Sequence, residues 1–217
     1  MTTEAGYEIL SLDDLDEYPS TAGTQILKPL RRRVKFEPFG VNAWLGRNTG
    51  DQVIERHSER DGAEELYVVI RGMASFTLGD ETFDAPVGTL VHAPPGTLRE
   101  ATALEPGTLV LAMGAKPGIP FTPSPWEDFA VAFARQQAGD EAGGREAMAE
   151  ALARDPEAWQ GPYNAACFEA VAGNPDAALA QLRLAVERGG DDVRGYAEKD
   201  SDLDPIRDHP GYSEAVA

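Results

Sequence analysis

The amino-acid sequence changes character near Pro120, and this change sets the limits on the fold. Before Pro120, short runs of β-branched and aromatic residues alternate with glycine and proline turn signals, a pattern typical of short strands. After it, alanine dominates together with leucine, glutamate and arginine, which favours helix. Strand and helix patterns do not alternate along the chain, and this argues against a parallel sheet.

The strand-rich part contains candidate strands at fairly regular intervals. They lie at residues 34–36, 43–45, 52–54, 66–70, 75–78 and 81–83. Turn signals such as Gly72, Gly79-Asp80 and Pro94-Pro95-Gly96 separate or follow them. Evenly spaced short strands are typical of a sandwich or barrel. The predicted fold is therefore mostly β plus α: a small antiparallel β-barrel or double-sheet jelly roll, followed by an α-helical region.

The helical part repeats at an interval of 34 residues. This interval separates Gly139 from Gly173, Phe129 from Tyr163, Ala132 from Ala166, Met148 from Leu182, and Ala151 from Ala185. A helix-turn-helix unit of this length resembles the tetratricopeptide repeat, and each glycine can end the first helix of a pair. Because about three units are usually needed to bury their apolar faces, we expect this tail to dock on the barrel or on a second subunit.

We divide the chain into an N-terminal segment at 1–29, a barrel at 30–120 and a helical region at 121–217.

The charge of the chain excludes some classes of partner. Acidic residues outnumber basic ones by 37 to 19, which gives a net charge of −18. Such a negative field disfavours nucleic acid and anionic membrane surfaces as partners. We therefore read the basic run at 31–33 as a solvated strand edge.

The cysteine content and the N-terminal residues suggest a location. The single cysteine, Cys167, excludes an internal disulfide framework and fits a reducing compartment. Residues 1–10 contain neither the basic nor the apolar segment of a signal peptide. No apolar run approaches the roughly 20 residues that a membrane-spanning helix needs. We expect a cytoplasmic protein.

The residues that carry the most chemical information lie between His57 and Gly72. His57 and Glu59 are two positions apart, so on a strand they point to the same face. Glu65 opens the next candidate strand, across a turn predicted at Asp61-Gly62. If that face points inward, these three side chains converge inside the barrel, where they can hold a divalent metal.

This segment resembles the first motif of the cupin family, in which His-x-His is followed by a glutamate, six residues and a glycine. Glu65 and Gly72 have that spacing, and Gly88, Pro94 and Gly96 fit the second motif. The resemblance covers roughly residues 30–117. It implies a cupin β-barrel, a homodimer formed through edge strands, and metal ligation by three histidines and the motif-one glutamate.

The departures from the cupin pattern are as informative as the matches. Only His57 and Glu65 match the family's metal ligands, whereas Glu59 and Arg99 stand where histidines are expected. The stretch before Glu65 is also one residue longer than in many cupins, which makes Glu64 an alternative ligand. A guanidinium is always protonated and only donates hydrogen bonds, so Arg99 cannot ligate a cation.

Three interpretations of Arg99 follow. In the first, Arg99 pairs with Glu59 or Glu65, because a buried charge must be paired, and the usual metal is absent. In the second, Arg99 faces the mouth of the pocket and binds an anionic ligand through two hydrogen bonds. In the third, a metal stays on His57, Glu59 and Glu65, and Arg99 is turned away.

The resulting functional prediction is a small-molecule-binding cupin with a degenerate metal site. Its expected pocket residues are His57, Glu59, Glu65, Arg99, His92 and Tyr67, although the motif does not fix the facing of His92. We expect no cofactor, with a divalent transition metal on His57, Glu59 and Glu65 as the alternative. The ligand is an unidentified small molecule, with an anion favoured by Arg99.

Two alternative functions remain open. One is a metal-dependent cupin enzyme, an oxygenase or isomerase, with non-standard ligands. The other is a protein-interaction module that binds a partner through the helical tail. In that case Phe168, Leu179 and Leu182 should be partly exposed in an apolar groove.

Overall fold

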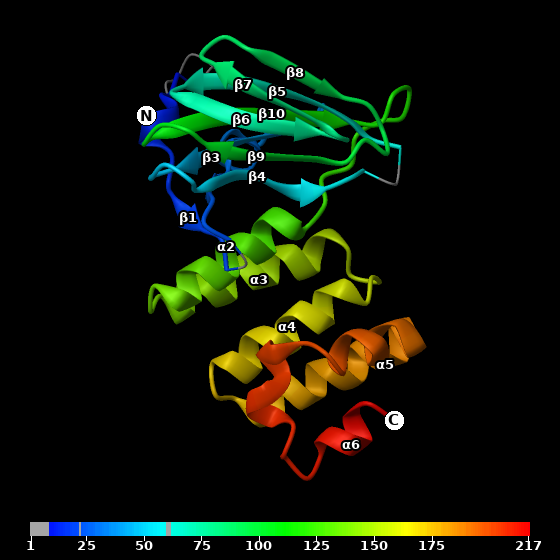
Figure 1. Cartoon of the computed structure of the whole chain (residues 1–217). Helices are drawn as coiled ribbons and strands as arrows, with labels where there is room; N and C mark the ends of the chain where they lie inside the picture. The colour runs from blue at the N-terminus through cyan, green and yellow to red at the C-terminus, as the bar shows by residue number, and fades with distance from the viewer. Residues whose placement is uncertain (1–8, 22, 60–61) are drawn as a thin grey trace. The chain divides into compact units, whose positions relative to one another are not determined.

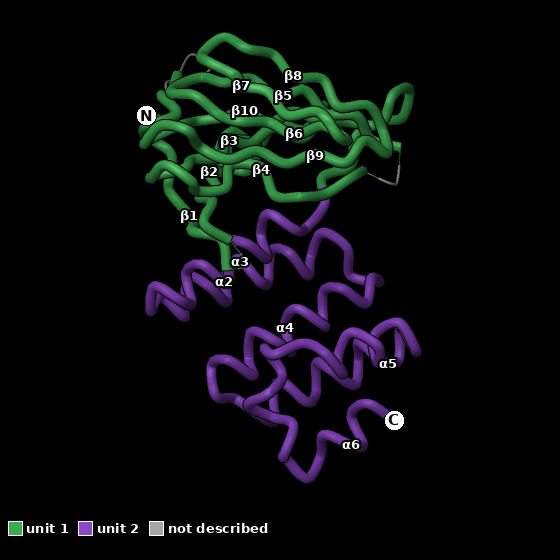
Figure 2. Tube along the Cα trace, viewed as in Figure 1, with its two compact units in different colours: residues 1–123 green, residues 124–217 purple. Residues whose placement is uncertain are grey.

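The structure is a computed structural model in which residues 9–21, 23–59 and 62–217 are described. The chain divides into two compact units, residues 1–123 and 124–217. The first unit holds the strands and the second holds the longer helices (Figure 1 and Figure 2).

The strands described in the first unit form two antiparallel sheets. One sheet has the order β1 (Tyr18–Pro19), β2 (Ile26–Lys28), β3 (Gly40–Gly46), β10 (Thr108–Ala115), β5 (Glu64–Arg71), β8 (Leu90–Ala93). The other has the order β4 (Gln52–His57), β9 (Arg99–Ala103), β6 (Met73–Leu78), β7 (Glu81–Pro86). The short helices η1 (Leu12–Asp14) and α1 (Leu30–Val34) complete this unit. The antiparallel arrangement predicted from the strand spacing is confirmed.

The core of the first unit lies between the two sheets. Side chains alternate between the faces of a strand, so Tyr67 and Val69 of β5 share the inner face. They pack in one cluster with Phe76 of β6 and Ala101 of β9, all four of which are buried. The Tyr67 and Phe76 ring centroids are 5.7 Å apart. This core fixes the positions from which the polar side chains of the site extend.

One strand prediction and one surface prediction are wrong in the N-terminal half. Residues 34–36 are not a strand, and the basic run at 31–33 lies in α1, where Arg31 is 2% exposed. Pro29 precedes the helix and Lys35 ends it with a left-handed φ of 53°. The arginines lie in its last turn, where positive charge interacts favourably with the helix dipole. The N–H of Lys35 donates to the carbonyl of Arg31 and closes the helix, so residues 34–36 do not pair as a strand.

The second unit consists of helices joined by short turns. Its elements are α2 (Trp126–Gln137), α3 (Glu141–Arg154), α4 (Gln160–Val171), α5 (Pro175–Ala197), η2 (Ser201–Ile206) and α6 (Tyr212–Ala215). None of the helices described in the chain combines the length and apolar character required to cross a membrane.

The interval of 34 residues corresponds to a repeated helix end. Gly139 follows α2 with a φ of 83°, and Gly173 follows α4 with a φ of 78°. After each glycine, the next backbone N–H donates to the carbonyl five residues earlier. These bonds join Asp140 to Arg135 and Asn174 to Glu169, both at 2.9 Å. The predicted glycine ends are confirmed: both first helices end in the same left-handed cap.

The apolar side chains of the second unit pack on one another. Phe168, Leu179 and Leu182 are between 0 and 2% exposed. Leu179 and Leu182 belong to the unit's core cluster, and Phe168 packs against Phe133 with ring centroids 5.9 Å apart. These residues do not form the exposed apolar groove that the interaction-module interpretation requires.

The repeated cap predicts opposite effects of alanine at two glycines of this unit. Gly173→Ala should lower the free energy of unfolding by about 1–2 kcal/mol, because an L-residue is strained in the left-handed region. Gly195→Ala should raise it by roughly 0.5–1 kcal/mol, because Gly195 lies inside α5 with open space around an added Cβ. Urea unfolding followed by far-UV circular dichroism measures both. Equal effects of the two substitutions would contradict the cap.

Candidate functional site

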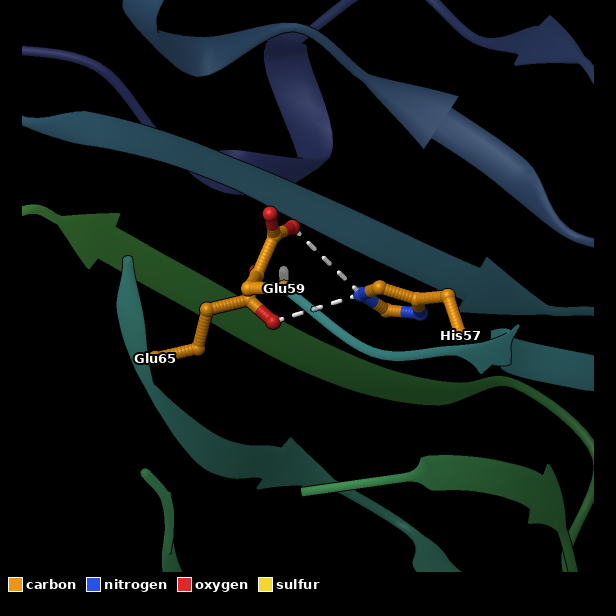
Figure 3. A group of neighbouring side chains, drawn as sticks. All are labelled: His57, Glu59 and Glu65. Atoms are coloured by element: carbon orange, nitrogen blue, oxygen red, sulfur yellow. Dashed lines mark hydrogen bonds and ion pairs between the residues drawn. The ribbon is translucent and has the colours of Figure 1, made fainter. Parts of the chain in front are cut away.

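Three strands bring the central side chains of the site together. His57 ends β4 and lies directly opposite Arg99, the first residue of β9. Paired residues on antiparallel strands point to the same face. Glu65 comes from β5 of the other sheet and shares its inner face with Tyr67 two residues later. Figure 3 shows the His57, Glu59 and Glu65 side chains pointing toward one another.

One carboxylate oxygen, Oε2 of Glu65, is the centre of the site. It accepts hydrogen bonds from Nε of Arg99 at 3.0 Å, from Nη2 of Arg99 and from the hydroxyl of Tyr67. Nε2 of His57 lies 3.3 Å from the same oxygen and 3.8 Å from Oε1 of Glu59. Arg99 and Glu65 thus form an ion pair with Tyr67 bonded to both.

Arg99 is fully enclosed by its partners. Its side chain is 0% exposed, against 18% for Glu65. Nη1 donates to the backbone carbonyl of Thr97 at 2.8 Å, and Nε donates to the Tyr67 hydroxyl at 3.2 Å. The side chain neither faces solvent nor turns away from Glu65. This geometry contains the pairing of Arg99 with Glu65 that the first interpretation expects, and it places Arg99 neither at a pocket mouth nor turned away from Glu65.

The contacts at Glu65 shift the titration of the surrounding groups. Burial alone would raise the pKa of Glu65, but hydrogen bonds from His57, Tyr67 and Arg99 outweigh it and lower the pKa to about 2. Burial and the adjacent Glu65 charge both raise the pKa of the Tyr67 hydroxyl. The cluster therefore holds Glu65 as a carboxylate and Tyr67 as a neutral hydrogen-bond donor.

Both ring nitrogens of His57 face oxygen acceptors. Nδ1–H donates to the backbone carbonyl of Glu55 at 2.8 Å, while Nε2 lies between the carboxylates of Glu59 and Glu65. The hydrogen bond with Glu65 is the largest cause of a raised His57 pKa, and burial opposes it. A ring in this position is either doubly protonated or presents its Nε2 lone pair to a cation.

The same residues form a candidate metal site. His57, Glu59 and Glu65 each offer a ligand atom, and these atoms lie within 4.8 Å of one another. An imidazole with two carboxylates is a donor set that a divalent metal can use. However, Arg99 already occupies Oε2 of Glu65, and its permanent positive charge would repel a cation there. The residue types fit a divalent metal, but the arrangement of charges does not.

His92 does not belong to this cluster, contrary to the prediction. It pairs with Leu66 across β8 and β5, so it shares the outer face with Leu66 and Glu64. Its side chain is 55% exposed, and Nε2 lies 3.0 Å from Oε2 of Glu64. Because side chains alternate along β5, Glu64 also points away from Glu65 and cannot replace it as a ligand.

Two parts of the site are not visible from residue types. The carbonyls of Glu55 and Thr97 hold His57 and Arg99, but a backbone acceptor leaves no signal in the side-chain pattern.

Of the predicted turn at Asp61-Gly62, Asp61 lies outside the described residues. Gly62 has a φ of 93°, a value that favours glycine.

No protein-family model and no curated protein matches the sequence. Among solved structures, the chain is similar to KdgF from Halomonas sp., with 21% identity over 47% of this chain and 86% of that chain, and a TM-score of 0.40. It is also similar to a sugar phosphate isomerase of the cupin superfamily from Silicibacter pomeroyi, with 16% identity, coverage of 50% and 76%, and a TM-score of 0.45. A predicted oxalate decarboxylase from Thermotoga maritima shows 12% identity, coverage of 50% and 99%, and a TM-score of 0.42. At these values the similarity says nothing about ligand or reaction.

The buried ion pair predicts a large loss of stability when Arg99 is removed. Arg99→Ala should lower the free energy of unfolding by about 3–5 kcal/mol, because Glu65 is left as a buried carboxylate without its cation. Arg56→Ala is the matched control on β4: its pair with Glu100 is solvated, so the expected loss is below about 1 kcal/mol. Denaturant unfolding measures both, and similar losses would contradict a special role for Arg99.

The position of His57 predicts how its titration responds to neighbouring carboxylates. Since its folded pKa is raised, the stabilisation it contributes is present at low pH and is lost as the pH rises through that value. Glu65→Gln should lower the His57 pKa, because the largest cause of the shift is removed. Glu64→Gln, on the outer face, should leave it unchanged. NMR titration of the His57 ring signals decides, and a pKa unmoved in Glu65→Gln would refute the assignment.

Proposed function

We propose that this chain binds a small molecule at the His57 and Glu59 end of the cluster. In this proposal the ion pair of Arg99 with Glu65 takes the place of the metal of a cupin-type site. The observation that carries it is the enclosed guanidinium of Arg99, bonded twice to Oε2 of Glu65. Where the cupin pattern has a metal-ligating histidine, this chain has a permanent positive charge paired with a carboxylate.

The exposure of the side chains supports a ligand at one end of the cluster. Arg99 and Tyr67 are buried, whereas the side chains of His57 and Glu59 are 29% and 33% exposed. Each residue then has a distinct role. Arg99 and Tyr67 keep Glu65 ionised, Glu65 orients the ring of His57, and His57 with Glu59 contacts the ligand.

The proposal concerns binding rather than a reaction, because a fold of this kind does not decide chemistry. A small-molecule ligand also agrees with the resemblance of residues 57–72 and 88–99 to the two cupin motifs. A metal-dependent enzyme is the second candidate, favoured by the three ligand atoms within 4.8 Å of one another. The homodimer, a protein partner of the helical unit and the cytoplasmic location stay predictions.

Metal content separates the two candidates. Elemental mass spectrometry of the untagged protein, after incubation with iron, manganese, nickel and zinc salts, should find much less than one metal per chain. Arg99→His removes the repelling charge and restores an imidazole, so this variant should bind metal where the wild type does not. A stoichiometric metal in the wild type that disappears in His57→Ala would reject the proposal and favour the enzyme.

A further inference from the structure

Three aromatic rings gather in the helical unit, where α4 and α5 pack together (Figure 1). Trp159 immediately precedes α4, Tyr163 lies one turn further on, and Tyr196 is near the end of α5. The Trp159 ring centroid is 5.9 Å from that of Tyr163 and 5.5 Å from that of Tyr196. The centroids of the two tyrosines are 6.3 Å apart. We call these three residues the aromatic triad.

Two adjacent glycines of α5 make room for the triad. A Cβ built on Gly189 would lie only 2.7 Å from Cγ of Trp159, so a side chain at this position would collide with the indole. Gly190 has a φ of 54° and a ψ of −129°, a conformation that favours glycine and interrupts the helix. The indole of Trp159 therefore lies directly on the α5 backbone, beside the bend that precedes Tyr196.

The three rings differ in their exposure to solvent. Tyr163 is buried and belongs to the core cluster of the unit, and Trp159 packs against that cluster while remaining half-buried. Tyr196 is 59% exposed and is not a member of the cluster. Within the described part of the chain, the Tyr196 hydroxyl makes no hydrogen bond. The triad thus has a fixed, buried base and one ring that faces solvent.

The surroundings of the exposed ring are acidic. Asp192 precedes Tyr196 by one turn on the same side of α5, is exposed, and has no ion-pair partner among the described residues. The carboxylate of Asp200 accepts a hydrogen bond from the Tyr163 hydroxyl at 2.8 Å. Residues 124–217 as a whole contain 19 acidic and 8 basic residues. The electrostatic field around the triad therefore attracts cations.

The exposed ring has no cation of its own. The face of an aromatic ring attracts a positive charge, and Arg145 uses this attraction elsewhere in the unit, with Cζ 5.8 Å from the Phe168 centroid. In the part of the chain that the structure describes, no such contact is made to Trp159 or Tyr196, although Lys199 lies three residues after Tyr196. The outer face of the Tyr196 ring is therefore open to a cation from another molecule.

We infer that Trp159 and Tyr196 form a docking surface for a basic peptide segment of a protein partner, with an arginine side chain over the Tyr196 ring. The planar guanidinium suits this position better than an ammonium, because it stacks on aromatic faces and is more weakly hydrated. Asp192 would attract a second basic side chain of the segment. This surface lies in the other unit from the ligand site of the proposed function and does not depend on it.

The open form of the surface favours a peptide over a small cation. A small ammonium ligand is recognised by several rings that surround it, whereas the rings of the triad pack against one another and one of them is buried. A single ring over a single cation contributes little at an exposed site. A basic peptide adds further charges, which the acidic unit attracts.

The experiment titrates three probes into the full chain at constant pH and ionic strength. The probes are a peptide of alternating glycine and arginine, its glycine and glutamate counterpart, and tetramethylammonium chloride. The NMR signal of the Trp159 indole N–H, assigned with Trp159→Phe, gives the Kd. Tyr196→Phe keeps the ring, and Tyr196→Leu keeps only apolar bulk. Val171→Ala is the control, because Val171 is an apolar residue of α4 that is 49% exposed. Far-UV circular dichroism checks that each variant is folded.

We expect the arginine peptide to shift the Trp159 signal and to bind more tightly than tetramethylammonium, and the glutamate peptide to have no effect. Tyr196→Leu should weaken the arginine peptide roughly three- to fivefold, as loss of one exposed cation–π contact predicts. Tyr196→Phe and Val171→Ala should leave the Kd unchanged.

Three results would overturn the inference. Unchanged affinity in Tyr196→Leu, or equal losses in the leucine and phenylalanine variants, would reject the role of the ring. Binding of tetramethylammonium as tight as that of the arginine peptide would reject a peptide partner. A Trp159 signal that does not respond to the arginine peptide would reject the surface altogether. Each result leaves the proposed function standing, because His57 lies in the first unit.

Discussion

The first unit depends on one buried interaction, the ion pair between Arg99 and Glu65. The two residues come from different sheets, so their contact fixes how β9 and β5 face each other at the polar end of the core. Desolvating two charges is costly, and the cost is offset only when further hydrogen bonds complete the pair. Tyr67 and the Thr97 carbonyl supply them, and His57 is then held by the oriented carboxylate. Stability and site geometry are therefore set by the same contacts.

The sequence allowed this ion pair to be predicted because Glu59 and Arg99 both stand where the cupin pattern has histidines. A guanidinium at a ligand position excludes a cation and demands a carboxylate, and only a few acidic residues lie near it in the pattern. The pattern could not show to which face of its sheet each side chain points, or how deeply that side chain is buried. The facing of His92 depends on its register with β5, and the exposure of Arg99 depends on how the sheets pack. Neither is a local property, so the residue pattern alone could not decide whether Arg99 is accessible to a ligand or to which face His92 points.

In the fold, too, some elements follow from local residue types and others depend on pairing between strands. Apolar runs such as 66–70 and 75–78 lie within strands because their residue types favour a half-buried sheet. The strand β9 reads Arg-Glu-Ala-Thr-Ala, has little β-propensity, and was not predicted. Its strand state comes from pairing on both sides with β4 and β6. In the second unit, by contrast, each glycine cap is a local property, and the interval of 34 residues located both.

The adjacent carboxylates Glu64 and Glu65 have a consequence for strand register. A slip of β5 by one residue would turn Glu64, Leu66 and Val68 inward, a face as apolar as the native one. Hydrophobic burial alone therefore does not distinguish the two alignments. The choice falls to polar and steric details: the Tyr67 hydroxyl on Glu65, and Gly114 opposite a glutamate that leans toward it. In this strand the contacts of the charged cluster therefore select one of the two alignments.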